Sequence, residues 1–350
     1  MRFIGNKENL VEKIAFLMEK SGVTGHTFFD FFAGTTSVGR FFKKNGWGVL
    51  SSDLLYFSYC LQKAYIENNT EPLFEKLFSE LKHKSRNLFA SPLDTVIDFL
   101  NTLPGKEGFI FSHYTPDGTA ALNTPRKYFS SENGKKIDAI RLQIEEWRLV
   151  DLINENEYYV LLAALIESVP FYANIAGVFA AFQKKWDPRA LKPFTLRTIE
   201  LCIGGKNNKA YNIDSLSLLE TVSADVFYVD PPYNERQYAP NYHVLETIAK
   251  YDNPVLRGVT GMREYSDQKS DFCNKEKAEK CLEKILSKAR CSTIILSYNS
   301  EGLLKKEEIL TKMSDFGSVD FYDIPYPRFR SNINTEKSNI NEYLFILKNK

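Results

Sequence analysis

The most constraining feature of this sequence is an unbroken apolar run at residues 27–32 that leads into a glycine turn. Apart from Asp30, the run does not alternate between apolar and polar residues, and such a pattern is typical of a strand buried on both faces of a parallel sheet. After the turn, Val38, Phe41 and Phe42 recur at helical spacing, and residues 48–52 predict a second strand. A strand–helix–strand unit of this kind predicts an α/β fold.

The rest of the chain divides by pattern into a helical stretch and a return to strands. The first apolar repeat, at residues 10–18, predicts a helix, and longer helices are predicted at 136–154 and 157–181. Further strands are expected at 210–213, 225–229, 292–298, 319–324 and 342–347. We therefore expect a cofactor-binding part at 1–64, an inserted, mostly helical lobe at 65–205 and a catalytic part at 206–350.

Composition narrows the class of protein. Apolar residues make up 43% of the chain, enough for a packed core, and the net charge of +1 gives no chain-wide attraction to phosphate. The five cysteines form no CxxC and the four histidines show no ligand spacing, so we expect no metal and a reduced, cytoplasmic protein. Without an apolar run of membrane length, neither a spanning helix nor a signal peptide is expected.

The turn after the first strand is a candidate cofactor loop. It joins a strand to the N-terminus of a helix, where backbone amides favour a carboxylate or phosphate, and Gly34 allows a ligand to approach closely. Asp53, about twenty residues on, has the position of an acid that binds ribose hydroxyls. A nicotinamide site fits these features too, although GxGxxG is absent, and a structural turn with a solvated Asp53 is the simpler alternative.

A second motif, Asp230-Pro231-Pro232-Tyr233, directly follows a predicted buried strand. It places a carboxylate, a rigid carbonyl and an aromatic face at the sheet edge where ligands bind, and its prolines remove two competing donors. Acceptors on both hydrogens of an amine would leave its lone pair directed at a methyl donor, and Tyr233 can stack on a flipped base. The structural alternative is a surface turn that ends the strand.

In this order, the motifs resemble those of the alpha class of DNA adenine methyltransferases, the family of the Dam and FokI-type methylases. Residues 2–7 are similar to the N-terminal cofactor motif and residues 31–35 to the cofactor loop, although Thr35 or Thr36 replaces a second glycine. The resemblance implies a Rossmann-like, S-adenosylmethionine-dependent methyltransferase sheet with an inserted target-recognition lobe. It also implies methyl transfer to the N6 amine of an adenine flipped out of duplex DNA.

The resemblance also assigns residues. Lys7 and the region of Phe3 would border the methionine end of the cofactor and Asp214 its adenine, although Lys7 also fits a solvated helix start and Asp214 a helix cap. Residues 326–343 are similar to the last family motif, in which Phe329 either holds the flipped base or packs in a hairpin. The full set of expected cofactor contacts is Phe3, Lys7, Asp30, Phe32, Ala33, Gly34, Thr35, Asp53 and Asp214.

DNA contact is expected at two places. Basic residues outnumber acidic ones between residues 184 and 209, which suits phosphate contact. A second candidate stretch, residues 234–275, follows the catalytic turn and begins with side chains that read base edges. The candidates are Lys184, Lys185, Arg189, Lys192, Arg236, Tyr238 and Asn241. A solvated face explains the scattered lysines equally well.

The expected partners are duplex DNA and a cognate restriction endonuclease acting on the same sequence. Alternative substrates for the same chemistry are an RNA adenine, a cytosine amine or a glutamine side chain. A different class of function is a nucleic-acid-binding relative that has lost activity, and the intact Asp230 and Tyr233 argue against it. The DNA sequence recognised depends on loop geometry and is not predicted.

Overall fold

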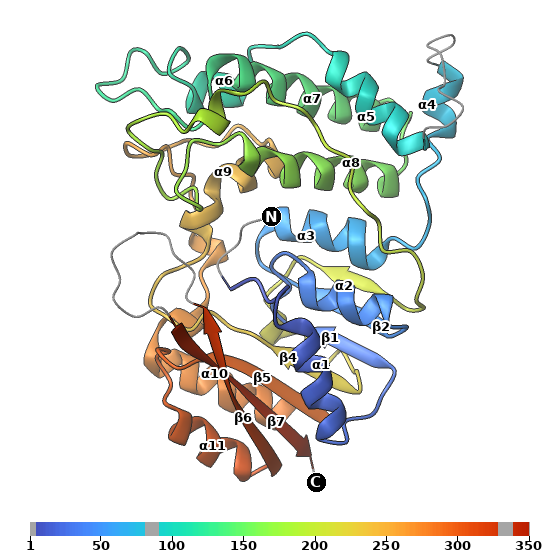
Figure 1. Cartoon of the computed structure of the whole chain (residues 1–350), viewed down its shortest axis with the longest axis vertical. Coiled ribbons are helices and arrows are strands. Elements are labelled where there is room, and N and C mark those ends of the chain that lie inside the picture. The colour runs from blue at the N-terminus through green and yellow to red at the C-terminus, as the bar shows by residue number, and fades with distance from the viewer. Residues whose placement is uncertain (1–4, 81–90, 328–338, 350) are drawn as a thin grey trace. The chain divides into compact units, whose positions relative to one another are not determined.

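The computed structural model describes residues 5–80, 91–327 and 339–349, which form two compact units (Figure 1). The sheet unit consists of the described parts of 3–69, 202–238 and 266–350. The helical unit consists of the described parts of Thr70–Leu201 together with Ala239–Tyr265. Within these ranges, no helix has the combination of length and apolar character needed to cross a membrane.

A seven-stranded sheet in the order β3-β2-β1-β4-β5-β7-β6 organises the sheet unit. Strands β1 to β5 pair in parallel, whereas β7 is antiparallel to both β5 and β6. Strands β2 and β3 are added on one side of β1, whereas β4 and β5 are added on the other side, so the strand order reverses between β1 and β4. Ligands of open α/β sheets bind at such a switch point. The strands are β1 (Thr27–Asp30), β2 (Gly48–Ser52), β3 (Lys209–Tyr211), β4 (Val226–Val229), β5 (Thr293–Asn299), β6 (Gly317–Pro327) and β7 (Asn339–Asn349).

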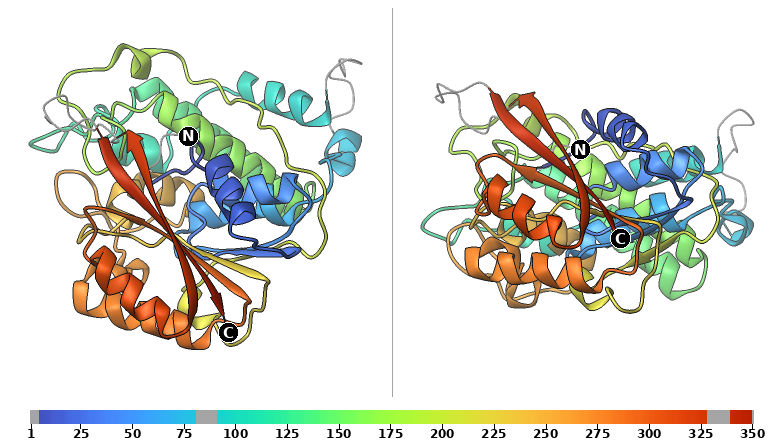
Figure 2. Two further views of the ribbon diagram at one scale, coloured as in Figure 1. Left: turned by 60° about the horizontal axis from the view of Figure 1, so that its bottom comes forward. Right: turned by 90° about the horizontal axis from the view of Figure 1, so that it is seen from below.

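Helices cover both faces of this sheet, which explains the unbroken apolar runs. Phe28 packs in a cluster with α1 and α2, whereas its neighbour Phe29 packs in a second cluster with α10 and α11. Figure 2 shows the ribbons of these helices on the two sides of the sheet. Successive strand residues point to opposite faces, so both must be apolar when both faces are covered. The α-helices of this unit are α1 (Val11–Lys20), α2 (Ser37–Lys44), α3 (Tyr56–Gln62), α10 (Lys275–Lys288) and α11 (Lys306–Ser314), and a π-helix, η1 (Lys63–Glu67), follows α3.

The helical unit corrects one predicted helix. The apolar pattern predicted a helix over 157–181, but α8 ends at Ser168 and only a short 3-10 turn, Val169–Phe171, follows. Pro170 explains the end, because proline lacks the N–H that an α-helix needs and disfavours helical geometry before it. The α-helices described here are α4 (Glu75–Glu80), α5 (Pro92–Thr102), α6 (Phe109–Tyr114), α7 (Ser131–Leu149), α8 (Glu155–Ser168) and α9 (Ala239–Lys250).

Residues 239–265 belong to the helical unit, although the sequence-based boundaries assigned them to the catalytic part. Two buried arginines of the 70–201 stretch explain this grouping. Arg126 donates to the carbonyls of Gly258 and Val259, and Arg141 donates to those of Ile248 and Ala249, at 3.0 to 3.2 Å. The segment also holds itself together, for instance through the ion pair from Arg263 to Asp252 at 2.7 Å.

Candidate active site

One pocket of the sheet unit gathers the loops that follow β1, β2 and β4. These loops leave the carboxyl ends of neighbouring parallel strands, including the switch point between β1 and β4. The lining residues come from the stretches 5–7, 30–38, 53–55, 214–216, 228–238 and 268–272. The predicted cofactor loop and the predicted catalytic motif therefore border one cavity.

Most of the predicted site residues that the structure describes line this pocket. Pro231 is buried beside it, and Phe3 and Phe329 lie outside the described residues. The predicted residues in the lining are Lys7, Asp30, Phe32, Ala33, Gly34, Thr35, Asp53, Asp214, Asp230, Pro232, Tyr233 and Tyr238.

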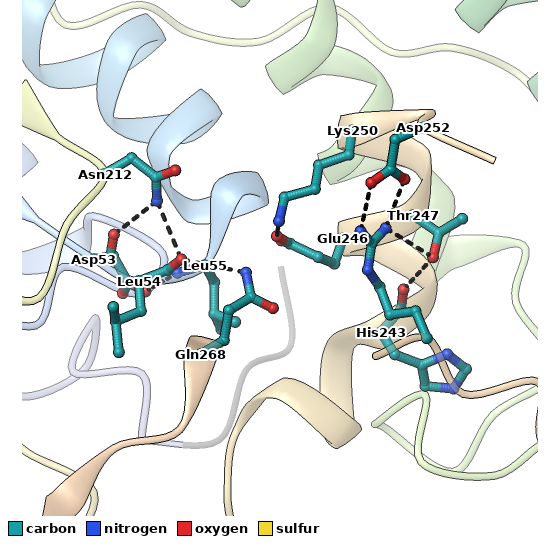
Figure 3. Close-up of polar contacts among 11 residues, drawn as sticks. Asp53, Leu54, Leu55, Asn212, His243, Glu246, Thr247, Lys250, Asp252 and Gln268 are labelled. Carbon is teal, nitrogen blue, oxygen red and sulfur yellow. Dashed lines mark hydrogen bonds and ion pairs between the residues drawn. The ribbon is translucent and has the colours of Figure 1, made fainter. Parts of the chain in front are cut away.

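The cofactor loop is held in place by Asp53. One carboxylate oxygen accepts the N–H of Gly34 at 2.9 Å, and the other accepts the N–H of Leu55 at 2.8 Å. Asn212 donates to the carbonyls of Asp53 and Leu54, so the loop after β2 is tied to the one after β3 (Figure 3). Asp53 thus shapes the cofactor loop, in addition to any contact with a ligand.

Thr36 occupies the left-handed backbone region, with φ of 64°, and its side chain is buried. This is the position at which a glycine would be free of strain, because a Cβ makes that region costly. We expect the free energy of unfolding of Thr36→Gly to exceed that of Thr36→Ala by about 1 kcal/mol. Urea denaturation of both variants measures the difference.

A matched pair at a right-handed helical position supplies the control. Glu12 lies exposed in the first turn of α1, where alanine is favoured over glycine. Glu12→Ala should therefore be more stable than Glu12→Gly, the opposite order to that at position 36. The same order at both positions would contradict the strain argument.

Two further carboxyl groups of the pocket, those of Asp30 and Asp214, accept hydrogen bonds from the backbone. Asp30 is buried and accepts the N–H of Gly39 at 3.1 Å, and burial raises the pKa of Asp30 to about 7. Asp214 accepts the N–H of Leu216 at 3.0 Å and caps a short 3-10 turn, so the predicted capping role is observed. The cap lies in the pocket lining, where a ligand can still reach its carboxylate.

Lys7 is a buried cation between two carboxylates, which contradicts its interpretation as a solvated helix-start residue. Its Nζ lies 2.5 Å from Glu342 Oε1 and 3.2 Å from Asp230 Oδ1. Burial disfavours the ammonium, but the two carboxylates outweigh it and raise the pKa of Lys7 above its usual value. Burial, aided by the charge of Glu342 and opposed by Lys7, raises the pKa of Asp230.

Two tyrosines complete the catalytic end of the pocket. Tyr233 is half-buried, and its carbonyl accepts the N–H of Leu303 at 2.9 Å, which fixes the turn that carries the ring. Tyr228 lies on β4 with 1% of its surface exposed, and its hydroxyl has no hydrogen-bond partner of good geometry among the described residues. A buried hydroxyl in a pocket wall is a group that a ligand could satisfy.

The sequence analysis placed residues 268–272 within a stretch expected to contact DNA and did not predict that they form a wall of the pocket. Gln237 and Ser270 exchange two hydrogen bonds at 3.0 and 2.8 Å, which fastens this wall to the catalytic loop. Gln268 donates to the carbonyl of Leu54 at 3.3 Å (Figure 3). Phe272 meets Phe32 edge to face, with ring centroids 5.4 Å apart. The stretch carries no motif, and only its return toward the sheet edge brings it to the pocket.

The candidate DNA contacts divide between the two units. Arg236 and Tyr238 follow the catalytic turn in the sheet unit, with Arg236 exposed and Tyr238 in the pocket lining. Asn241 lies in α9 of the helical unit. The basic residues Lys184, Lys185, Arg189 and Lys192 are exposed there, and Arg189 pairs with Asp187.

Comparison with known proteins identifies the family. Residues 3–312 match the family described as D12 class N6 adenine-specific DNA methyltransferase. The chain belongs to this family. The membership confirms the resemblance that the order of the motifs indicated, and a methyltransferase family implies a methyl donor.

Relatives of different lengths share this similarity. Type II methyltransferase M.FokI of Planomicrobium okeanokoites is 42% identical over 99% of this chain and 52% of its own length. Modification methylase StsI of Streptococcus sanguinis is 38% identical over 100% of this chain and 52% of its own length. The chain thus spans about half of these two relatives. Type II methyltransferase M.NlaIII of Neisseria lactamica is 39% identical over 99% of both chains.

Proposed function

We propose that this protein transfers a methyl group from S-adenosylmethionine to the N6 amine of an adenine flipped out of duplex DNA. The observation that carries the proposal is the single pocket bordered by the Gly34 loop, the Asp230 motif and Tyr233. A cofactor held by the loop and a base held by the motif would meet inside it. Family membership supports adenine as the target.

The charges of the pocket favour S-adenosylmethionine over a nicotinamide dinucleotide. Among the described lining residues are five aspartates and two lysines, so acidic groups are in excess. S-adenosylmethionine carries a sulfonium and an ammonium cation, whereas a dinucleotide would bring a pyrophosphate into this acidic setting. The buried hydroxyl of Tyr228, which has no hydrogen-bond partner of good geometry among the described residues, offers a further polar contact for a ligand.

Several lining residues would hold that cofactor. The Gly34 loop, Asp53 and Asp214 offer backbone and carboxylate groups, while Phe32 and Phe272 offer apolar faces for a ring. When bound, the cofactor supplies an electrophilic methyl group.

Asp230 and its neighbours would then orient the target amine. The carboxylate of Asp230 accepts one hydrogen of the amine and the carbonyl of the rigid turn accepts the other, which leaves the nitrogen lone pair directed at the methyl group. Tyr233 stacks on the flipped ring. The amine needs no strong base, because its nitrogen bonds to the methyl carbon as the bond from that carbon to sulfur breaks, and the positively charged amine then releases its proton to solvent. Positioning and electrostatics therefore carry the rate.

We further propose that the helical unit is the target-recognition lobe and that its exposed basic side chains contact DNA phosphates. The names of the relatives M.FokI and StsI describe a type II methyltransferase and a modification methylase. By analogy, the protein would protect the sites of a cognate restriction endonuclease, in the cytoplasm where the DNA lies.

Asp53→Ala is expected to weaken S-adenosylmethionine binding. The variant loses a charge-assisted hydrogen bond to a ribose hydroxyl, worth roughly 1.5–3 kcal/mol, and also the acceptor that holds Gly34. Calorimetric titration with the cofactor measures the change. The control is Asp315→Ala, which removes an exposed aspartate of the same unit outside the pocket. Equal affinity for S-adenosylmethionine in Asp53→Ala and Asp315→Ala would show that Asp53 does not contribute to cofactor binding.

The proposed function is tested by supplying radiolabelled S-adenosylmethionine with duplex DNA, single-stranded DNA and RNA, and mapping the modified base. We expect label at adenine N6 in duplex DNA at one sequence. Label found in RNA or on cytosine would show that RNA or cytosine, and not adenine in duplex DNA, is the substrate. Cofactor binding without transfer to any of the three would instead favour an inactive relative.

A further inference from the structure

Glu342 is a buried acid that the proposed chemistry does not use. It lies on β7, with 4% of its surface exposed, and its Oε1 accepts hydrogen bonds from Lys7 Nζ at 2.5 Å and Ser297 Oγ at 2.9 Å. No part of Glu342 lines the pocket. A buried carboxylate costs free energy unless it is paired, so its position beside the catalytic motif calls for a role.

The geometry shows what Glu342 does to Lys7. The ammonium lies 0.7 Å closer to Glu342, at 2.5 Å, than to Asp230, at 3.2 Å. An ammonium paired with Asp230 alone would compete with the target amine for the carboxylate, because both groups donate N–H hydrogens to its oxygens. Lys7 must nevertheless stay close, because its charge helps keep a buried Asp230 ionised.

We propose that Glu342 is a positioning residue that draws the ammonium of Lys7 away from Asp230 and so leaves the catalytic carboxylate free to accept the target amine. Lys7 then acts as a shared counter-ion, near enough to stabilise the charge of Asp230 and too firmly held by Glu342 to block it. Ser297 fixes the carboxylate of Glu342 in this position. The inference rests on the proposed methyl transfer.

Other charged and titratable groups also face Asp230. These are Lys7 before α1, Glu342 on β7, Asp30 at the end of β1, Tyr228 on β4 and Tyr233 in the motif. Lys7 is the only cation among these five. The balance between Lys7 and the surrounding acids therefore sets how readily Asp230 ionises, and Glu342 is the acid that touches Lys7 most closely.

Glu342→Gln is expected to lower both the maximal rate of methyl transfer and the pH of the acid limb of the pH–rate profile. The maximal rate of methyl transfer should fall about tenfold, because Lys7 would now pair with Asp230. The acid limb of the pH–rate profile should move to lower pH by about one unit, because Asp230 loses a negative neighbour and gains a closer cation. A loss of rate caused only by a damaged fold would leave the acid limb where it was.

A double-mutant cycle with Lys7→Met gives the decisive comparison. Without Lys7, Asp230 and Glu342 are two buried carboxylates that repel each other, so Glu342→Gln should raise the rate in that background. The same substitution is thus expected to lower the rate of the wild type and to raise that of Lys7→Met. A loss of rate in both backgrounds would overturn the proposal.

Two further variants complete the experiment. Glu157→Gln removes a buried carboxylate that caps α8 in the helical unit, and it should leave the pH profile unchanged. If Glu342→Gln does not fold, Ser297→Ala tests the same contact, with a smaller loss of rate and a shift of the acid limb in the same direction.

A readout without cofactor or DNA separates this inference from the proposed function. In the free protein, the carboxyl carbon of Asp230 can be followed by NMR and assigned by its loss in Asp230→Asn. Its pKa should be lower in Glu342→Gln than in the wild type. If the wild type methylates DNA but the pKa of Asp230 is the same in Glu342→Gln as in the wild type, this inference alone is overturned. A wild type that transfers no methyl group counts against the proposed function.

Discussion

Replacing Asp230 with alanine is expected to abolish nearly all methyl transfer while cofactor and DNA affinity change far less. The carboxylate is the proposed acceptor of one amine hydrogen, and Glu342 cannot take its place, because Glu342 lies outside the pocket lining. The fold should persist, since Lys7 keeps Glu342 as an ion-pair partner at 2.5 Å when Asp230 is removed. Single-turnover rates at saturating cofactor and DNA measure the loss directly.

The threshold for this prediction is a tenfold loss. A variant that keeps more than about a tenth of the wild-type rate has lost under 1.4 kcal/mol of transition-state stabilisation, too little for the proposed acceptor. Asp230→Asn is the shape-matched comparison, because its amide keeps one oxygen acceptor but carries no charge. We expect Asn to retain more activity than Ala and less than Asp. Equal rates for the wild type, Asp230→Asn and Asp230→Ala would show that Asp230 is not the acceptor of the amine hydrogen.

The parts of the site that are local in sequence could be predicted from the sequence. The Asp230 motif and the Gly34 loop each follow a buried strand directly, so their place at the sheet edge follows from the strand itself. The role of Lys7 could not be predicted in this way. Its carboxylate partner Glu342 lies 335 residues away, and only the pairing of β5 with β7 brings that residue to the catalytic motif.

The helical stretch was harder to predict for a related reason. The apolar pattern through residues 157–181 is that of a buried segment, and a buried helix and a buried irregular segment share this composition. Beyond Ser168 the polar backbone is satisfied by individual contacts, such as the N–H of Asn174 to the carbonyl of Tyr128 at 2.8 Å. Such contacts depend on residues distant in sequence, and periodicity does not report them.

The basic stretch at 184–192 is exposed as a phosphate-binding surface requires, but its charges are not equally available. Lys184, Lys185 and Lys192 lie exposed on the helical unit. Arg189 is paired with Asp187 through its guanidinium, and the same carboxylate accepts the backbone N–H of Arg189. A phosphate would have to compete with Asp187 for Arg189, so the three lysines should dominate any DNA contact of this stretch.

Changing Lys184, Lys185, Arg189 and Lys192 together to glutamine is expected to weaken binding to every duplex by a similar factor. Phosphate contacts carry no sequence information, and each one lost should reduce the slope of log affinity against log salt by about 0.9. Because Arg189 is already paired, a triple variant that keeps Arg189 and changes only the three lysines should weaken binding nearly as much as the quadruple variant. Methyl transfer at saturating DNA should remain near that of the wild type, since no pocket residue has changed. Fluorescence titrations across a salt series measure the slope, and a slope equal to that of the wild type would mean that these side chains form a solvated face and that DNA is held elsewhere.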